Sequence, residues 1–387
     1  MNASINVKRN SSAFFTFMFV FLILPFFSIA GIIDNISETQ HQIWQVVSMI
    51  LMGLLALSVA SDIRFKWPVG LFIAFQGIIL FSCCFHHGPQ YGIITVTVAA
   101  IILFMLMQSP YFEDIINAVC IIVITSVVIN FVTIVLRLGE DNAVFFIGGK
   151  NALSTFLIPG AFLVVINTYL REKKFSVGYR ISIFLCFVSV FVAKSATGIV
   201  VTAVALIFLV LTKQVKIKKN MYLFVIAFAY IMPLLFLDNL IDSEFWYEFT
   251  AMLGKETTLT SRTIIWEEAK ELIRDNWILG AGRGVKISFI GLWNDVQSMY
   301  ESHNLILEIF VEGGILAFSV FVLIILKIFQ GLNIQEKKSR IIFVALCTSL
   351  VNGLTESTIN NTFVIIILAV ACRFAEEDER AEKLNEK

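Results

Sequence analysis

Residues 303–328 read HNLILEIFVEGGILAFSVFVLIILKI, and this stretch decides the class of the fold. After its polar start it is long and apolar enough for a helix that crosses a bilayer, which takes about 20 residues. Glu308 and Glu312 are the charges in its first half. Because a charge inside the hydrocarbon core is costly, such residues normally face a wet or protein-lined cavity. The stretch therefore predicts a membrane-spanning helix beside an internal cavity.

The composition of the whole chain indicates the same environment. Of its 387 residues 58% are hydrophobic and 15% are charged, with a mean hydropathy of +0.85. Soluble domains are about 45–50% apolar and about 25% charged, so that class is excluded. The net charge of zero indicates nothing about nucleic acid, and no nucleic-acid partner is expected. The six cysteines lie in or beside apolar runs and lack the spacing of zinc ligands or of a disulfide framework.

The chain contains twelve apolar segments that are candidates for membrane-spanning helices. They lie at about residues 12–33, 42–60, 67–85, 91–108, 115–138, 151–170, 180–193, 197–212, 220–239, 303–328, 340–356 and 358–373. The stretch 180–211 reads as one helix or two, and the placement of Lys and Arg favours two half-length helices hinged at residues 194–198. With twelve crossings and a cytoplasmic N-terminus, most basic residues lie inside, as the positive-inside rule requires. We therefore expect an all-α integral membrane protein of about twelve helices with both termini in the cytoplasm.

One long extracytoplasmic loop stands out in this topology. Residues 240–302 separate nine helices within 1–239 from three helices within 303–373, and a cytoplasmic tail follows at 374–387. Within the loop, SRTIIWEEAKELIR begins with Ser261 at a helix N-cap position. One face of the predicted amphipathic helix is apolar and consists of Ile265, Ala269, Leu272 and Ile273. We expect this face to lie toward lipid in the membrane interface; the alternative is a loop that only forms a solvated cap.

Two loop residues are candidates for chemistry. His303 lies where the loop meets the tenth helix, and an imidazole that titrates near neutral pH suits a general base. The alternative is an interfacial histidine that bonds to lipid or to the backbone. Arg262 carries a permanent charge that binds phosphate through two parallel hydrogen bonds, which suits a lipid-linked diphosphate. For Arg262 the alternatives are a pair with Glu267 and contact with ordinary lipid headgroups.

Three further features have a weaker signal. GAGRG at residues 280–284 resembles a phosphate loop but follows no βαβ pattern, so we expect a tight turn in which Arg283 is available to anions. Glu356 lies in the eleventh apolar segment, which indicates contact with an internal cavity. His86 and His87 have no third ligand nearby, so no metal site is expected.

The order of these motifs resembles the shared region of the O-antigen ligase/polymerase family. The sequence has S-R-x-x-x-W from Ser261, G-x-G from Gly280, and H-N-x-x-L-E followed by E-G-G-I-L from His303. The similarity covers roughly residues 180–370 and is specific in its order. GGKNALSTFLIPG at 148–160 also resembles the start of the sixth helix in that family. The resemblance implies a glycosyltransferase-C-like fold in the bacterial cytoplasmic membrane.

The resemblance also implies a reaction. It is a metal-independent, cofactor-free and inverting glycosyl transfer from an undecaprenyl-diphosphate-linked sugar chain. His303 would orient or deprotonate the acceptor hydroxyl, and Arg262 would neutralise the leaving diphosphate. The further substrate-binding candidates are Lys194, Ser195, Arg283, Asn304, Glu308 and Glu356. A flippase and a chain-length regulator are candidate partners beside the lipid bilayer.

One position departs from the family pattern. The family usually carries an Arg after the Ser in the turn between the seventh and eighth helices, but this turn reads AKSATG, with Ala196 after Ser195. Lys194 supplies a point charge without the fork of a guanidinium, and Arg283 is the second candidate for the absent cation. The diphosphate site is therefore expected to differ from that of the family.

Three functions are compatible with these patterns. We favour polymerisation of repeat units into capsule, O-antigen or exopolysaccharide. The alternative is a ligase that moves finished glycan to a lipid or protein acceptor. A flippase or transporter would show internal repeats and charges along the membrane midplane, whereas here no repeat is evident and the polar residues gather toward the outer side.

Overall fold

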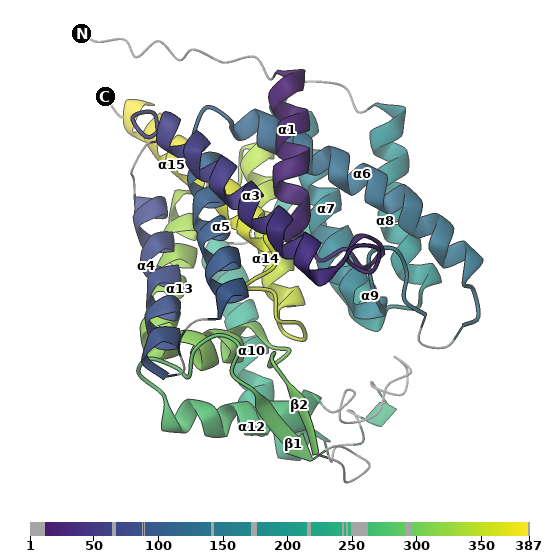
Figure 1. Ribbon diagram of the computed structural model, residues 1–387, viewed down its shortest axis with the longest axis vertical. Helices are drawn as coiled ribbons and strands as arrows, with labels where there is room; N and C mark the ends of the chain where they lie inside the picture. Colours follow the sequence, from purple (N-terminus) through teal and green to yellow (C-terminus); the bar gives the residue numbers. More distant parts are fainter. Residues whose placement is uncertain are drawn as a thin grey trace.

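The computed structural model describes residues 12–63, 67–86, 88, 90–140, 143–171, 176–214, 218–241, 244, 247–248, 262–290 and 296–385. The elements in chain order are α1 (Ala13–Ile23), η1 (Leu24–Phe26), α2 (Ala30–Ile33), α3 (Glu38–Ser58), α4 (Trp67–His86), α5 (Tyr91–Met107), α6 (Phe112–Leu136), α7 (Lys150–Leu170), α8 (Val177–Val192), α9 (Ala196–Gln214), α10 (Lys219–Ile241), α12 (Arg262–Asp275), β1 (Ile287–Ile290), β2 (Val296–Met299), α13 (Leu305–Gly331), α14 (Lys337–Asn352) and α15 (Thr362–Asn385). Figure 1 shows a bundle of helices with α12 and the two strands at one end, which we call the loop end.

Each predicted apolar segment contains a helix, and six of the helices are long and apolar enough to cross a membrane. These six are α3, α4, α6, α7, α9 and α13. The shorter apolar helices are Ala13–Phe26, α5, α8 and the Lys219–Ile231 part of α10. The hinge expected at residues 194–198 is confirmed, because α8 and α9 are separate helices. The helices are those of a multi-pass membrane protein, and the number of twelve crossings stays a prediction.

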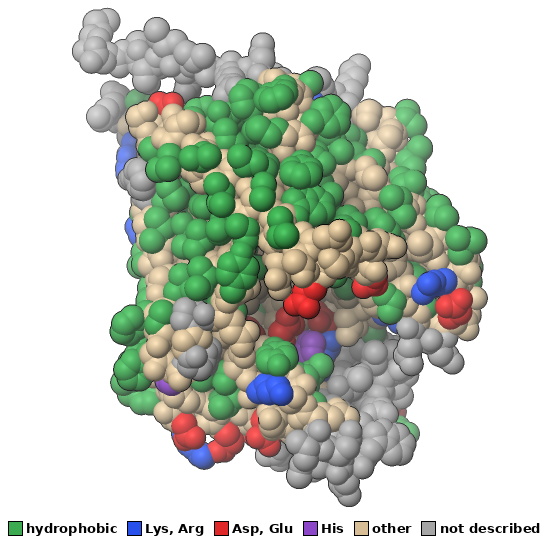
Figure 2. Space-filling view, in the orientation of Figure 1, with side chains coloured by type: hydrophobic (Ala, Val, Ile, Leu, Met, Phe, Trp, Pro, Cys, Tyr) green, Lys and Arg blue, Asp and Glu red, His purple; other side chains and the backbone are tan. Residues whose placement is uncertain are grey.

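Apolar side chains form both the surface and the interior of the bundle. Only 17% of the most apolar part of α3 is buried, compared with 78% of that of α7. Phenylalanines on α1 and leucines on α3 are exposed at the surface of the bundle. Figure 2 shows a broad hydrophobic area on the bundle, away from the loop end. An apolar surface of this extent is stable against lipid and not against water. In the interior, α14 packs against α7, and the apolar half of α15 packs against α7, α13 and α14.

The first predicted segment, 12–33, is not one helix. Pro25 has no N–H to donate to the carbonyl of Phe21, and α1 ends at Ile23. The free Phe21 carbonyl accepts a hydrogen bond of 3.1 Å from the Trp44 indole, and the Pro25 carbonyl accepts one of 3.0 Å from His41 Nε2. α3 therefore satisfies the backbone groups that the proline leaves without a helical partner.

The last helix extends into the predicted tail at 374–387. α15 continues without a break to Asn385. Two pairs four residues apart, Arg373–Glu377 at 3.1 Å and Lys383–Glu379 at 2.6 Å, lie on its charged half and support the helix. The loss of hydropathy after residue 373 therefore marks a change of surroundings and not the end of the helix.

α13 is interrupted at Gly314, whose backbone has φ 61° and ψ −161°. In a continuous helix the Ile315 N–H would donate to the Val311 carbonyl. Here the Ala281 N–H donates to the Val311 carbonyl at 2.7 Å, and the Ile315 N–H donates to the Trp277 carbonyl at 2.8 Å. The loop before the strands thus inserts its backbone into the break and satisfies both groups.

The glycine-rich turn expected at 280–284 lies against this break. Gly280, Gly282 and Gly284 have φ values of 72°, 88° and 82°, which glycine adopts without strain. A Cβ on Gly280 would lie 2.5 Å from the backbone nitrogen of Gly313, so only glycine allows this approach. The Ser82 hydroxyl on α4 donates to the Gly280 carbonyl at 3.1 Å and holds the turn in place.

The amphipathic helix of the loop is present as α12, but its apolar face packs on protein. Ile265, Trp266 and Ala269 are buried against β1 and against Leu307 and Val311 of α13. The expectation that this face lies toward lipid is therefore wrong. The β1–β2 hairpin, which no strand pattern predicted, supplies the apolar cover that lipid would otherwise provide. Ser261, the predicted N-cap, lies outside the described residues.

Candidate active site

The turn before α13 has an unusual backbone at His303. Its φ is 51°, a left-handed value that is uncommon for residues other than glycine, although histidine is among the more tolerant. The His303 N–H donates to the Ser357 hydroxyl at 3.0 Å, and the Leu305 N–H donates to the Gly353 carbonyl at 2.7 Å. The connection between α14 and α15 therefore holds this turn from outside α13.

Asn304 and Glu308, two predicted substrate-binding residues, fix the turn. Asn304 is the N-cap of α13, because its Oδ1 accepts from two backbone N–H groups at 3.0 and 3.2 Å. The Glu308 Oε2 accepts from the Ser302 N–H at 2.6 Å, from the Ser302 hydroxyl at 2.7 Å and from the Ser357 hydroxyl at 3.2 Å. Glu308 is buried, so its carboxylate serves the His303 turn and not the surface.

Glu356 brings Arg262 and His303 together. Its Oε1 accepts from Arg262 Nη2 at 2.6 Å, and its Oε2 lies 3.7 Å from His303 Nδ1. The second distance exceeds a hydrogen bond but is within the range of an ion pair. His303 Nδ1 is buried and has no hydrogen-bond partner among the described residues. A carboxylate beside Nδ1 favours the tautomer that is protonated there, which leaves Nε2 free to accept a proton.

Glu301 adds a second acidic group to this region. Its side chain reaches the surface, yet the removal of its carboxylate from bulk water raises its pKa above the ordinary value, and Glu356 and Glu312 raise it further. His303 lowers the pKa, and its effect is smaller than that of burial but larger than that of either carboxylate. Figure 2 shows a hollow near the loop end in which acidic side chains and a histidine lie.

Arg283 belongs to a different and closed cluster. Its Nε and Nη2 each donate to the Glu312 carboxylate at 2.9 Å, and its Nη1 donates to the Thr97 hydroxyl at 2.7 Å. Gln76 accepts from Nη2 at 3.4 Å, and the Asn360 amide donates to Glu312 at 2.9 Å. The described residues thus engage all three guanidinium nitrogens. The expectation that Arg283 is available to a diphosphate is wrong, because a buried carboxylate already neutralises it.

Lys194 and Ser195 lie at the turn between α8 and α9. The Ser195 hydroxyl donates to the Lys150 carbonyl at 2.8 Å and accepts from the Gly198 N–H at 3.3 Å, so it begins α9 and ties it to the start of α7. Lys194 is exposed and has φ 53°. Within the described part of the chain, neither side chain contacts Arg262, Glu356 or His303. The role of Lys194 toward a diphosphate stays a prediction.

Several residues of these clusters were not predicted as site residues. Ser302 and Ser357 hold Glu308, and their sequence context is an ordinary polar loop without a distinguishing pattern. Gln76 and Thr97 interrupt apolar helices α4 and α5, and such polar residues in apolar segments are a usable signal. Neither residue reveals its partner, because Arg283 lies about 200 positions away.

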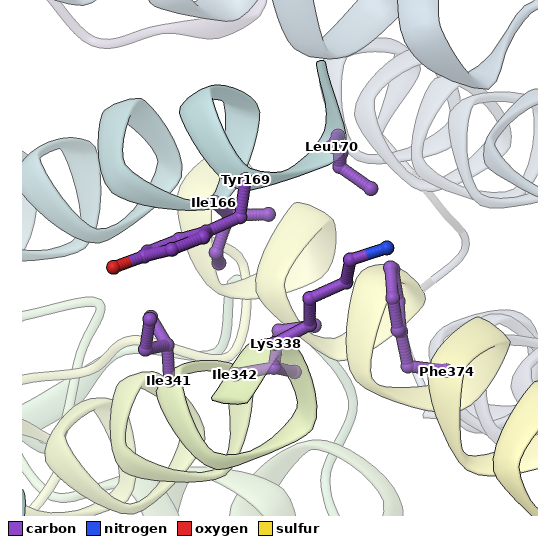
Figure 3. A pocket seen from close by; sticks show the side chains of 7 residues that line it. All are labelled: Ile166, Tyr169, Leu170, Lys338, Ile341, Ile342 and Phe374. Carbon is purple, nitrogen blue, oxygen red and sulfur yellow. The ribbon is translucent and has the colours of Figure 1, made fainter. Parts of the chain in front are cut away.

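Two cavities differ in their position and in their room for a ligand. One lies at the loop end between η1, α7 and the start of α15 and has a volume of about 100 Å³. The other, which Figure 3 shows, is lined by residues of α7, α14 and α15 at the opposite end of the bundle. Its lining is apolar apart from Tyr169 and Lys338, and it has practically no room even for water. Only the first of these two is a candidate for ligand binding.

One comparison with known proteins finds a similarity that covers part of the chain. Residues 181–322 match the family model described as O-antigen ligase, a range that includes Arg262, Arg283 and His303. No curated protein matches the chain, and no solved structure matches it, so the likeness to a glycosyltransferase-C fold stays a prediction. The match indicates glycosyl transfer in the assembly of surface glycans. Residues 181–322, which make up less than half of the chain, are therefore similar to the domain that this family model describes.

Proposed function

We propose that this protein polymerises undecaprenyl-diphosphate-linked repeat units into a surface polysaccharide on the outer face of a bacterial cytoplasmic membrane. The observation that carries the proposal is the bridge that Glu356 makes between Arg262 and His303. It puts a base and a permanent cation at one carboxylate. A glycosyl transfer from an activated donor needs little more than positioning, a base and charge stabilisation.

The roles follow from the atoms that remain available. The acceptor hydroxyl attacks the anomeric carbon, a new C–O bond forms, and His303 Nε2 takes the proton. The bond between that carbon and the diphosphate oxygen breaks, and the electron pair leaves with the diphosphate. Arg262 contacts Glu356 through Nη2, and no other described residue bonds its Nε and Nη1, which can bind the departing oxygens. Glu356 orients both side chains. Attack opposite the leaving group inverts the anomeric centre without a metal or cofactor.

A ligase that transfers finished glycan is the second candidate, because the matching family model is described as O-antigen ligase. The Ala196 position favours the polymerase, since the turn lacks the Arg that the family usually has there. A flippase and a chain-length regulator would act with the polymerase, and Lys194 is the remaining candidate for the second cation.

The test is the His303→Ala variant in the bacterium that makes the glycan. We expect single repeat units on the surface and no polymer, with transfer reduced about 10²–10⁴-fold, the usual contribution of a general base. His41→Ala is the matched control, because His41 bonds to a backbone carbonyl in the η1 region.

Three other results would each change the conclusion. Long polymer that remains linked to undecaprenyl diphosphate would favour the ligase. Repeat units trapped on the cytoplasmic face would favour transport. Unchanged polymer in a variant that is made in normal amounts would show that His303 is not the base.

A further inference from the structure

The cavity at the loop end shares one chain segment with the candidate active site. In the connection from α14 to α15, Glu356 and Ser357 contact Arg262 and the His303 turn, and Asn360 and Asn361 line the cavity. Four extended residues span at most about 14 Å, so the two sites are close neighbours. The lining residues are Phe26, Phe27, Ser28, Ile147, Ala152, Thr155, Phe156, Asn360, Asn361, Thr362 and Phe363.

Three aromatic rings pack together among the lining residues. The ring centroids of Phe27 and Phe363 are 4.6 Å apart, and those of Phe156 and Phe363 are also 4.6 Å apart. Because the three rings come from the residue after η1, from α7 and from α15, the shape of the cluster depends on the fold. Aromatic surface of this kind suits the C–H faces of a ring-shaped ligand.

Asn360 presents a buried acceptor without a partner. Its Nδ2 donates to Glu312 at 2.9 Å, which sets the orientation of the amide. Its Oδ1 is buried and makes no hydrogen bond within the described part of the chain. Buried polar atoms in proteins are almost always paired, so a lone acceptor beside a cavity indicates a donor from a ligand or from water.

The other polar groups supply both donors and acceptors. The Asn361 Oδ1 accepts from the Phe363 N–H at 2.9 Å, and no described residue accepts from its amide nitrogen, which remains as a donor. The Thr155 hydroxyl donates to the Ala152 carbonyl at 3.0 Å and keeps its lone pairs as acceptors. Ser28 is exposed at the rim. None of the described lining residues is charged, which disfavours a phosphate or an acidic sugar.

We propose that this cavity binds one neutral sugar residue of the glycan, and this inference rests on the proposed function. A sugar ring offers hydroxyl donors to Asn360, hydroxyl acceptors to Asn361 and C–H faces to the phenylalanines. An acyl or polyprenyl chain would leave both amides without partners, at the cost of buried unpaired polar groups. A volume of about 100 Å³ has room for a few water molecules or part of one ring, so one sugar residue enters the cavity in part and a longer chain does not fit.

The test is saturation-transfer NMR on the full-length protein in lipid nanodiscs. The probes are the methyl glycosides of glucose, galactose, N-acetylglucosamine and rhamnose, with glucuronic acid as the acidic counterpart. We expect transfer to at least one neutral glycoside, none to glucuronic acid, and a loss to background in Thr155→Leu, whose larger side chain fills the cavity. Thr212→Leu is the matched control, because Thr212 bonds to its own helix in the same way at the far end of α9.

A second variant covers the case in which Thr155→Leu does not fold. Asn361→Asp keeps the oxygen that accepts from the Phe363 N–H and replaces the amide donor by a charged oxygen. Loss of neutral glycoside binding in this variant supports the inference. Absence of transfer to every neutral glycoside in the wild type, or transfer that survives both variants, overturns it.

The outcome is independent of the test of the proposed function. His303→Ala should bind the same glycosides as the wild type, because His303 does not line the cavity. If His303→Ala abolishes polymer and the cavity variants change neither binding nor polymer, the proposed function is supported and the proposed sugar site is contradicted. If His303→Ala leaves polymer intact, the proposed function falls while the binding result still reports on the cavity.

Discussion

Two buried arginine–glutamate pairs lie at the loop end, and they differ in what they leave available. Arg283 and Glu312 bond through two parallel contacts, and Thr97, Gln76 and Asn360 occupy the remaining positions. Their side chains are 10% and 2% exposed.

Arg262 and Glu356 share one contact, with exposures of 10% and 9%, and the second carboxylate oxygen lies toward His303. We call Arg283–Glu312 the closed pair and Arg262–Glu356 the open pair. The closed pair joins the glycine turn to α13, whereas the arginine of the open pair has donors left for a ligand. Charge alone therefore does not identify a site; unused hydrogen-bonding capacity does.

The largest effect on stability is expected for the closed pair. Arg283→Met should lower the free energy of unfolding by about 3–5 kcal/mol, because Glu312 remains buried without a counter-charge. The measurement is the apparent melting temperature of the purified variant in detergent. The control is Arg274→Met, which removes an exposed pair with Glu271 and should cost at most about 1 kcal/mol. An Arg283→Met protein with normal stability and no transfer would move Arg283 into the reaction.

The open pair should affect the reaction more than the fold. Arg262→Met should reduce transfer about 10²–10³-fold, the usual loss when one stabilising donor of a transition state is removed. Arg262→Lys should recover part of this activity, since a point charge replaces the fork. Polymer formation from purified lipid-linked repeat units is the measurement. A fall in melting temperature as large as that of Arg283→Met would show that the two pairs are equivalent.

Glu308 links the open pair to α13 through the turn that it holds. Glu308→Ala should cost about 1–3 kcal/mol of stability, because the Ser302 N–H and both serine hydroxyls lose their acceptor. Glu308→Gln keeps one acceptor oxygen and should recover most of the loss. Thermal unfolding of the two variants gives the comparison, and equal melting temperatures would mean that the turn does not depend on this carboxylate.

The smallest effect is expected for Glu301, whose pKa is raised chiefly because its carboxylate is partly removed from water, and less so by Glu356 and Glu312. Its folded pKa is raised above the ordinary 4.5, so the folded state favours the protonated form. Its carboxylate therefore opposes folding as the pH rises from about 4.5 through the folded pKa, and the effect is absent below that window. Glu301→Gln should melt at a higher temperature than the wild type at pH 8 and at the same temperature at pH 4. A gain of equal size at both pH values would exclude this cause.

The positions of helices were predictable because apolar segments of the required length leave few alternatives. Errors fell where a local bond or a tertiary contact changed the outcome. Pro25 ended α1 early, so the predicted first helix at 12–33 is not continuous. The apolar face of α12 was recognised, but nothing in its own sequence distinguishes lipid from the β1–β2 hairpin and α13 as the surface that covers it.

The site was predictable by residue type and only partly by arrangement. His303, Arg262 and Glu356 were each singled out, and the fold brings them together. Arg283 was also singled out, and the fold pairs it with the buried Glu312 and not with Glu356. Which carboxylate meets which arginine depends on the break of α13 at Gly314 and on the connection between α14 and α15.

The amino-acid sequence by itself determined a helical membrane protein with one polar loop, because hydropathy over about 20 residues acts locally along the chain. It also singled out His303 and Arg262 as candidate site residues. Only the tertiary structure decided which arginine keeps donors for a ligand and which has all its nitrogens engaged by described residues. It also decided that the connection between α14 and α15 contacts the His303 turn and lines a cavity without charged residues. Those properties depend on contacts between residues distant in sequence, and such contacts exist only when the helices are packed.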